Sequence, residues 1–266
     1  SNPTDTLSSM VYMAYNQRSL FVTGVWTTVQ LALAGTAIAF VLALLMVFLR
    51  IQEPDKRNND FVKIIKIVAN KFARFYIFVI RGTPMMVQSL IFYYAIFNLF
   101  KRTGMSVTEI NRVWSLFISG LVTVSLNSTA YLAEVLRGGI LAVDAGQMEA
   151  ARSLGMTHWQ AMRRVVFPQA IKNSLPAIGN EFIINIKDSS VLCVLGVSDL
   201  MFMTRSVAGI YYKGTECYLI AATVYLFLTY LSSLLLKAIT GRMTAPDNTK
   251  RRQGNQTVDL GLPSSN

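Results

Sequence analysis

The sequence predicts an all-α, polytopic membrane protein with about five transmembrane helices. Three observations lead to this fold class. Of the 266 residues, 53% are hydrophobic and 15% are charged, and the mean hydropathy of +0.42 exceeds what a soluble domain needs. The hydrophobic residues gather in runs long enough to cross a membrane. The basic residues, which produce a net charge of +11, lie mainly between these runs.

The first apolar run covers residues 22–49, about 42 Å as a helix at ~1.5 Å per residue, enough to cross a ~30 Å hydrocarbon core with tilt. The polar residues 1–20 before it are expected to form an external segment. They contain no basic region followed by an apolar core, so we expect the first span to be retained. Gly35, Ala39 and Ala43 recur every four residues, which predicts close packing against another helix.

Residues 50–60 form a charged loop, and a basic amphipathic helix is expected to follow at the cytoplasmic surface. Thr83 as a cap and Pro84 as the first helical residue predict a start or kink of the second span, which runs to about Phe100. Arg81, just before Gly82, either faces a polar pathway or reaches toward lipid phosphates. The cations of the amphipathic helix are Lys63, Lys66, Lys71 and Arg74.

A polar stripe marks the predicted third span, which covers residues 114–136 after an external loop at 101–112. Polar groups in lipid are costly, so this stripe is expected to face protein or a water-filled cavity. Glu134 lies seven residues beyond Asn127 on the same face, and it is expected to pair with Arg137 near the cytoplasmic end. The stripe consists of Ser115, Ser119, Thr123 and Asn127.

The predicted fourth span, residues 170–200, is interrupted by Pro176 and by a polar stretch, Lys187 to Ser190. Two carboxyls and an amide fall at positions i, i+4 and i+7, so one helical face carries them at membrane depth and they are functional candidates. The alternative is an ion pair between Lys187 and Asp188 that only stabilises a broken helix. The three residues on this face are Glu181, Asn185 and Asp188.

An external loop at 201–217 and a fifth span at 218–236 complete the predicted topology. With the N-terminus outside and the C-terminus cytoplasmic, the inner segments hold 17 of the 25 Lys and Arg residues and the outer segments hold 6. The positive-inside rule therefore favours this orientation. The transmembrane domain is expected to cover residues 21–242, and residues 243–266 are expected to form a disordered cytoplasmic tail.

A short polar and basic segment, Glu149 to Pro168, lies between the third and fourth spans. Gly155 is expected to interrupt the helix that Glu149 begins, and Thr157 is a plausible cap for a second helix that runs until Pro168 starts the next element. Two short helices at an angle predict a compact cytoplasmic knob that suits a socket in a partner. Its polar faces carry Arg152, Arg163 and Arg164.

These residues carry a resemblance to a known family. Glu149-Ala150-Ala151, then Gly155, then Val165, Phe167 and Pro168 resemble the cytoplasmic coupling motif of permease subunits of bacterial ABC importers, with mild departures at Val165 and Phe167. Four further blocks resemble the polar amino acid uptake branch of that family. They are Arg81 to Pro84, Ala133 to Gly139, Gly146-Gln147 and Lys187 to Ser190.

The resemblance implies a type I importer-like permease in the bacterial cytoplasmic (inner) membrane, with a cytoplasmic coupling segment at 141–168. The implied partners are a second permease subunit, identical or paralogous, two ATP-binding subunits, an extracytoplasmic amino-acid-binding protein and membrane lipid. The ATPase-coupling candidates are Glu149, Ala150, Ala151, Gly155, Met156, His158, Trp159 and Arg163. The substrate-pathway candidates are Asn127, Glu134, Glu181, Asn185, Asp188, Ser189 and Ser190, and the gating or structural candidates are Arg81, Gly82, Thr83, Pro84 and Arg137.

Several activities are not expected of this chain. It has no Gly-x-x-x-x-Gly-Lys loop followed by Ser or Thr, so we expect ATP and Mg to be bound by a partner and the chain not to be an enzyme. Cys193, Cys217 and the single His158 fit no metal spacing. The basic residues lie beside apolar spans and not on a soluble amphipathic surface, so we expect no nucleic-acid binding.

Two other classes remain open at this point. The intramembrane carboxyls also suit an ion-coupled secondary transporter or channel, although no inverted repeat is visible. A non-transporting scaffold whose knob recruits a cytosolic protein is the third possibility. Within the importer interpretation, methionine or another small organic solute is an alternative cargo, and an Asp188 that faces a cavity favours a cationic over an acidic amino acid.

Overall fold

The computed structural model describes residues 5–51 and 59–243, and within these residues the protein is helical and contains no strand. The helices are α1 (Thr6–Asn16), α2 (Arg18–Ile51), α3 (Asp60–Gly82), α4 (Met85–Arg102), α5 (Val107–Val113), α6 (Leu116–Leu141), α7 (Ala145–Ser153), α8 (His158–Ala161), a π-helix η1 (Met162–Val166), α9 (Phe167–Asp188), a 3₁₀-helix η2 (Ser189–Leu195), α10 (Leu200–Tyr211) and α11 (Gly214–Met243).

The expected number of spans agrees with this architecture. Among the described residues, α2, α6 and α11 are long and apolar enough to cross a membrane. Two bent pairs raise the possible number to five: α3 with α4, bent by 114°, and the helical stretch His158–Leu195 with α10, bent by 54°. The predicted fold class, an all-α polytopic membrane protein with about five spans, is therefore confirmed.

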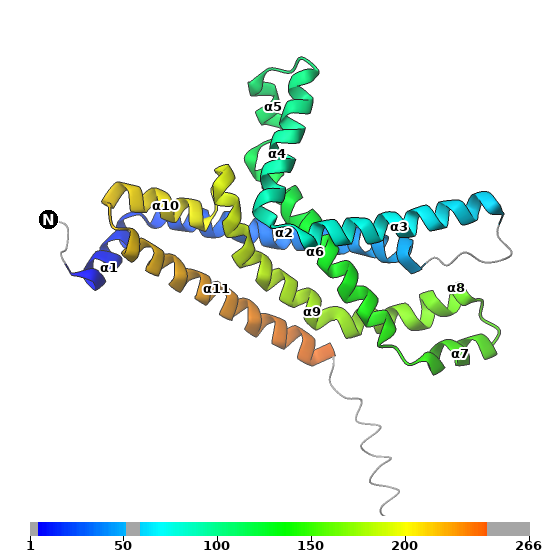
Figure 1. The fold of residues 1–266 in the computed structure, drawn as a ribbon. Coiled ribbons are helices and arrows are strands. Elements are labelled where there is room, and N and C mark those ends of the chain that lie inside the picture. Colours follow the sequence, from blue (N-terminus) through cyan, green and yellow to red (C-terminus); the bar gives the residue numbers. More distant parts are fainter. Residues whose placement is uncertain (1–4, 52–58, 244–266) are drawn as a thin grey trace, which may run out of the picture.

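Helix α2 forms the centre of the bundle and packs most extensively on α6, with α9, α3 and α10 around it (Figure 1). The predicted small-residue stripe makes this contact possible. A Cβ at Gly35 would lie 2.5 Å from Val124 Cγ1, and Ala39 and Ala43 are fully buried. Small side chains let the two backbones approach closely, which is how helices associate without a hydrophobic driving force in lipid.

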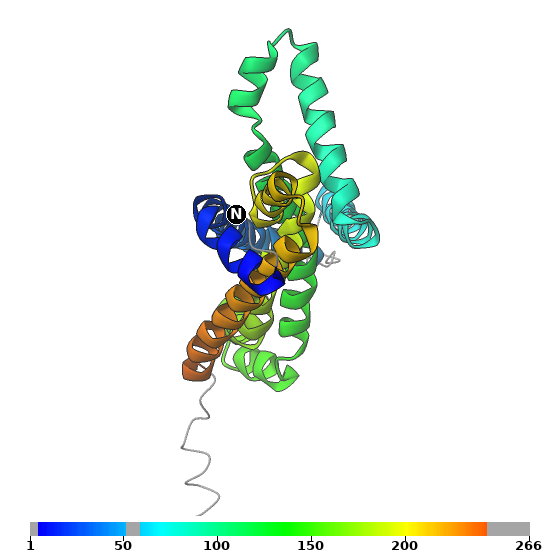
Figure 2. The same cartoon turned by 90° about the vertical axis from the view of Figure 1, so that its left-hand side faces the viewer.

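Helices α4 and α5 form an arm that projects from the bundle (Figures 1 and 2). The predicted cap assignment at its base is wrong by one residue, because α4 begins at Met85 with Pro84 in the N-cap position. Thr83 ends α3 instead, and its hydroxyl donates to Val79 O over 2.9 Å. Helix α3 also continues through Arg81, so the basic amphipathic segment and the residues before Thr83 form one helix.

The expected external loop at 201–217 is also wrong, because residues 200–211 form α10. Asp199 caps this helix by accepting a hydrogen bond from Phe202 N over 2.9 Å. Leu200 and Val207 are fully buried in a cluster with Met13 and Phe21, so tertiary packing of one apolar face orders a segment that is too short to span.

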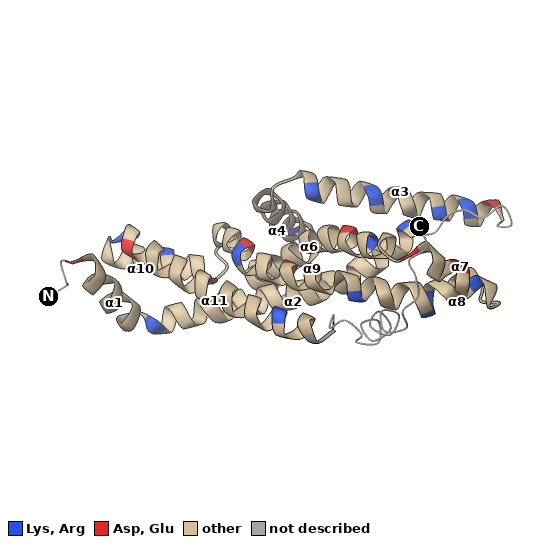
Figure 3. Cartoon of the chain, turned by 90° about the horizontal axis from the view of Figure 1, so that it is seen from below, with Lys and Arg blue, Asp and Glu red and all other residues tan. Residues whose placement is uncertain are grey.

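The helices at the two ends are longer than the spans expected there, which were residues 22–49 and 218–236. Helix α2 begins at Arg18 and α11 ends at Met243. Apart from Met243, the last residue of α11, the expected disordered tail at 243–266 lies outside the described residues, as do residues 52–58 of the expected loop at 50–60. Lys and Arg recur along α3 and lie near the α7–α8 end of the molecule (Figure 3).

Candidate functional site

Helices α7 and α8 form a lobe at the end of the molecule opposite α1 and α10 (Figure 1). The turn between them is set by local sequence. Gly155 has φ +85°, its N–H donates to Arg152 O over 3.0 Å, and Met156 N–H donates to Ala151 O over 3.2 Å. This Schellman arrangement satisfies the last carbonyls of α7 and needs a left-handed residue, so the predicted helix break at Gly155 is confirmed.

The predicted cap at Thr157 is also confirmed. Its hydroxyl accepts a hydrogen bond from Gln160 N over 3.2 Å, and Thr157 N donates to Gln160 Oε1 over 2.9 Å. This reciprocal capping box starts α8 two residues after the glycine. The lobe therefore has a defined shape with few contacts to the bundle at its tip.

The outer surface of the lobe is available to a partner. Glu149 and Ala150 are exposed on α7, and within the described residues the Glu149 carboxylate forms no ion pair. Leu154 at the turn is 81% exposed, Met156 is half-buried, and Ala151 is buried against the rest of the lobe. An exposed carboxylate beside an exposed Leu suits a socket with mixed polar and apolar walls.

The second helix of the lobe is not a separate short helix, which corrects the prediction. It continues from α8 through η1 into α9, and Pro168 follows directly after the π-helical turn η1, which changes the hydrogen-bond pattern just before the proline. The 31 residues from His158 to Asp188 thus form one rod of roughly 45 Å at ~1.5 Å per residue. The rod connects the lobe to the middle of the bundle.

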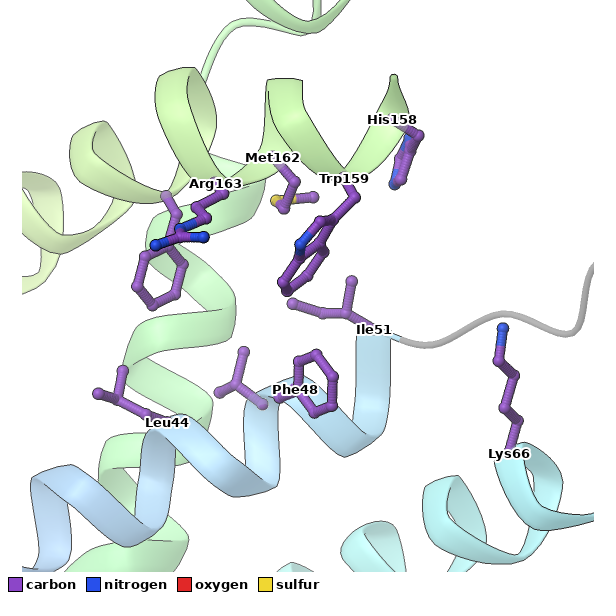
Figure 4. Close-up of a pocket in the computed structure, with 10 residues that line it drawn as sticks. Leu44, Phe48, Ile51, Lys66, His158, Trp159, Met162 and Arg163 are labelled. Carbon is purple, nitrogen blue, oxygen red and sulfur yellow. The ribbon is translucent and has the colours of Figure 1, made fainter. Parts of the chain in front are cut away.

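Three of the coupling candidates face the bundle. His158, Trp159 and Arg163 line a cavity of about 910 Å³ between the rod and the ends of α2 and α3 (Figure 4). The Trp159 ring meets the Phe48 ring edge-on, with centroids 5.7 Å apart. Trp159 therefore packs on α2.

Two pathway candidates, Asn127 and Asn185, are buried and bonded between helices. Asn185 Nδ2 donates to Thr36 Oγ1 over 2.8 Å and its Oδ1 accepts from Ser128 Oγ over 3.0 Å, so this amide joins α9 to α2 and α6. Asn127 Nδ2 donates to Gln88 Oε1 over 2.9 Å. Gln88 Nε2 in turn donates to Ile80 O over 2.7 Å, a carbonyl freed at the α3–α4 bend.

Glu134 lies in an ion-pair network near the C-terminal end of α6. The predicted pair with Arg137 is confirmed at 2.9 Å, and a second pair joins the other carboxylate oxygen to Arg50 at the end of α2. The Glu134 side chain is 22% exposed. With two cations on one carboxylate, Glu134 links α2 to α6.

The predicted polar face on α9 divides at its end. Glu181 is 8% exposed and faces the bundle, whereas Lys187 and Asp188 are exposed where α9 gives way to η2. The alternative of a Lys187–Asp188 ion pair is not observed, because neither residue forms an ion pair with any residue that the structure describes. Ser189 is buried and donates to Ile186 O over 3.1 Å, and Ser190 is half-buried.

The remaining candidates lie at the bend between α3 and α4. The Arg81 guanidinium sits 5.3 Å from the centroid of the Tyr131 ring, a cation–π contact that joins α3 to α6. Gly82 and Pro84 are exposed, and a Cβ at Gly82 would meet no atom within 4 Å. The bend is held by Gln88 and not by a steric need for Gly82.

Four residues of these networks were not among the sequence-derived candidates. Gln88 had a usable signal, since it is an amide in an apolar run one turn after a proline. The others had none, because hydroxyls and loop-edge cations are common in membrane helices. They are Thr36, Ser128 and Arg50.

Comparison with known proteins identifies a family and relatives that this chain resembles. Residues 64–245 match the family model of the binding-protein-dependent transport system inner membrane component. The glutamine transport system permease protein GlnP of Escherichia coli K12 is 34% identical over 176 residues, which cover 66% of this chain and 76% of GlnP. The nopaline transport system permease protein NocM of Agrobacterium fabrum is 31% identical over 214 residues, 79% of this chain and 82% of NocM.

Solved structures of two transporters also resemble this chain. A crystal structure of an amino acid ABC transporter with histidines matches with a TM-score of 0.72 and 38% identity, over 90% of this chain and 99% of that one. The inward-facing MetNI methionine ABC transporter shares the fold, with a TM-score of 0.65 at 20% identity over 85% of this chain and 96% of that one. The chain therefore belongs to the family of binding-protein-dependent transport system inner membrane components and is a multi-pass permease of the inner membrane.

Proposed function

We propose that this chain is the permease subunit of an ATP-driven ABC importer for polar amino acids. Its relatives carry glutamine or nopaline, and the most similar solved structure cited above is an amino acid transporter. The observation that carries the proposal is the unbroken rod from His158 to Asp188, which connects an exposed lobe to the point where the fourth span breaks.

The rod supports a specific coupling mechanism. With the N-terminus outside, the lobe lies in the cytosol and its tip, around Glu149 and Leu154, docks into a separate ATPase subunit that binds ATP and Mg. When the ATPase pair closes, it pushes on the lobe. Because a helix transmits displacement along its axis, the push moves Asp188 relative to α2 and α6 and changes access to the pathway.

The break between α9 and η2 supports an amino acid as cargo. Lys187 and Asp188 are both exposed and form no ion pair within the described chain. Opposite charges side by side match the carboxylate and the ammonium of a zwitterion. A second permease subunit would close the pathway around them, and an extracytoplasmic binding protein would deliver the cargo.

Asp188→Asn tests the cargo site. The substitution keeps the shape but removes the charge offered to the ammonium group, so uptake should fall at least tenfold while assembly with the ATPase is retained. Asp60→Asn is the control, because Asp60 is an exposed carboxyl at the start of α3. Equal losses of uptake and assembly in Asp188→Asn would assign the residue a structural role.

Vanadate-sensitive uptake in proteoliposomes separates the importer from its alternative. Uptake that requires the co-expressed ATPase, a binding protein and ATP is the expected result. Uptake by the permease alone, driven by an ion gradient, would contradict the proposal and favour an ion-coupled transporter.

A further inference from the structure

The cavity between the rod, α2 and α3 has the chemistry of a ligand site that the coupling mechanism does not need. Its volume of about 910 Å³ lies within the range of pockets that enclose small molecules, about 300–1,000 Å³. The walls are almost entirely apolar. They comprise Leu44, Val47, Phe48, Ile51, Trp159, Met162 and Phe167.

The polar part of the lining is cationic. Lys66 lies on the α3 side, away from Arg163 on the rod, and none of the described residues that line the cavity is acidic (Figure 4). Arg163 forms no ion pair within the described residues. A guanidinium beside an apolar wall suits a phosphate group that is attached to a hydrocarbon chain.

The cavity adjoins an exposed apolar surface of α2. Val41, Leu45 and Phe48 lie on one face of α2, at positions i, i+4 and i+7, and are 64%, 51% and 41% exposed. This apolar stripe runs from the middle of the span to the cavity. Trp159 is 56% exposed beside it, and an amphipathic indole is typical of the headgroup level of a membrane.

The wall that carries Arg163 has unusual backbone geometry. Met162 to Val166 form a π-helical turn, in which Phe167 N–H donates to Met162 O. Such turns occur mostly as insertions in α-helices and frequently at functional sites. Two lining residues, Met162 and Arg163, belong to this turn.

We propose that this cavity binds an anionic phospholipid of the cytoplasmic leaflet, with its phosphate at Arg163 and an acyl chain along Leu44 and Phe48. Basic pockets at the cytoplasmic ends of membrane helices bind anionic headgroups in this way. The proposal rests on the orientation proposed above, which places the end of α2 at the cytoplasmic face. A lipid here would touch both α2 and the coupling rod, so membrane composition would tune coupling.

Native mass spectrometry of the purified permease tests the site without any ATPase or transport, so its result is independent of the proposed function. The probes are phosphatidylglycerol and phosphatidylethanolamine at equal concentrations. Arg163→Gln should weaken phosphatidylglycerol retention about fivefold, equivalent to roughly 1 kcal/mol. Arg164→Gln removes the same charge from the neighbouring exposed residue, which does not line the cavity, and should retain wild-type binding.

A second pair of variants tests the acyl-chain contact. Phe48→Ala should weaken phosphatidylglycerol retention, whereas Leu45→Ala, one turn away on the same exposed face but outside the cavity, should not. Equal effects of Arg163→Gln and Arg164→Gln, or equal retention of both lipids, would overturn the proposal. So would displacement by equimolar inorganic phosphate. Release of the lipid when the ATPase subunit is added would assign the cavity to that subunit instead.

Discussion

The tip of the lobe and the centre of the bundle are both built around polar residues, but they are held in opposite ways. Residues 152–160 of the lobe are held by hydrogen bonds between neighbours in the sequence, namely the Schellman turn at Gly155 and the capping box at Thr157. The centre is held by bonds between residues far apart, such as Asn185 with Thr36 and Ser128.

This difference means that the shape of the lobe and the stability of the bundle depend on different residues. A turn that is fixed locally keeps its form when little packs against it, so it can present a surface to a partner without contributing much to the fold. Polar side chains buried between helices contribute to stability and to the relative positions of the helices. Substitutions in the two regions should therefore have different signatures.

The largest effect on stability is expected where α6 meets α9. A Cβ at Gly139 would lie 2.1 Å from Ser174 Oγ and 2.7 Å from the backbone oxygen of Ala170. Gly139→Ala should therefore force the helices apart and lower the free energy of unfolding by roughly 1–3 kcal/mol. Thermal unfolding in detergent measures the effect.

Gly138→Ala is the matched control for that variant, because a Cβ there meets no atom within 4 Å. An alanine in an open helical position is favoured over glycine by roughly 0.5–1 kcal/mol, so this variant should be neutral or slightly stabilised. If Gly138→Ala and Gly139→Ala both raised or both lowered the free energy of unfolding, the α6–α9 contact would not be as close as described.

Asn185→Ala should have the next largest effect. It removes two hydrogen bonds between helices, each worth about 0.6 kcal/mol on average in membranes, and leaves a small cavity, so we expect a loss of roughly 2 kcal/mol. Asn180→Ala on the exposed side of α9 is the control. A wild-type melting temperature for Asn185→Ala would mean that the amide is not a structural clamp and would leave it available to cargo.

Substitutions in the Glu134 ion-pair network should lower the free energy of unfolding by smaller and unequal amounts. The Arg50 side chain is 16% exposed and the Arg137 side chain 41% exposed, so solvent screens the second pair more strongly. Arg50→Gln should cost about 1 kcal/mol and Arg137→Gln less than ~0.5 kcal/mol. Chemical denaturation in detergent distinguishes them, and a larger loss in Arg137→Gln would contradict the assignment of Arg50 as the main link.

The same contrast explains what could be predicted from the sequence. Glycine at a left-handed position and a Thr–Gln capping box are local signals, so the break at Gly155 and the start at Thr157 were predictable. Helical spacing alone predicts the small-residue stripe of Gly35, Ala39 and Ala43 and the pair between Glu134 and Arg137. Each of these features depends on residues within about two turns of one another.

The features that failed or were missed depend on tertiary contacts. Residues 200–211 fold as α10 because Leu200 and Val207 find apolar partners on α1 and α2, which no local pattern reveals. The clamp at Asn185 needs an α2 hydroxyl 149 positions away. The rod through Pro168 was missed because a proline signals a helix boundary, whereas here the helix continues past the proline after a π-helical turn.

The most direct test of the coupling mechanism is at Gly155, where a substitution should affect coupling more than it affects the stability of the bundle. Asn tolerates the left-handed region much better than the β-branched Val, and neither meets a neighbour, since a Cβ at Gly155 has open space around it. The measurement is cargo-stimulated ATP hydrolysis in liposomes that contain the permease, the separate ATPase and the binding protein. If the lobe couples the two subunits, Gly155→Val should reduce the cargo-stimulated ATP hydrolysis at least tenfold while its melting temperature stays close to that of the wild type. Gly155→Asn should keep most of the stimulation. Equal stimulation in all three proteins would contradict coupling through the lobe.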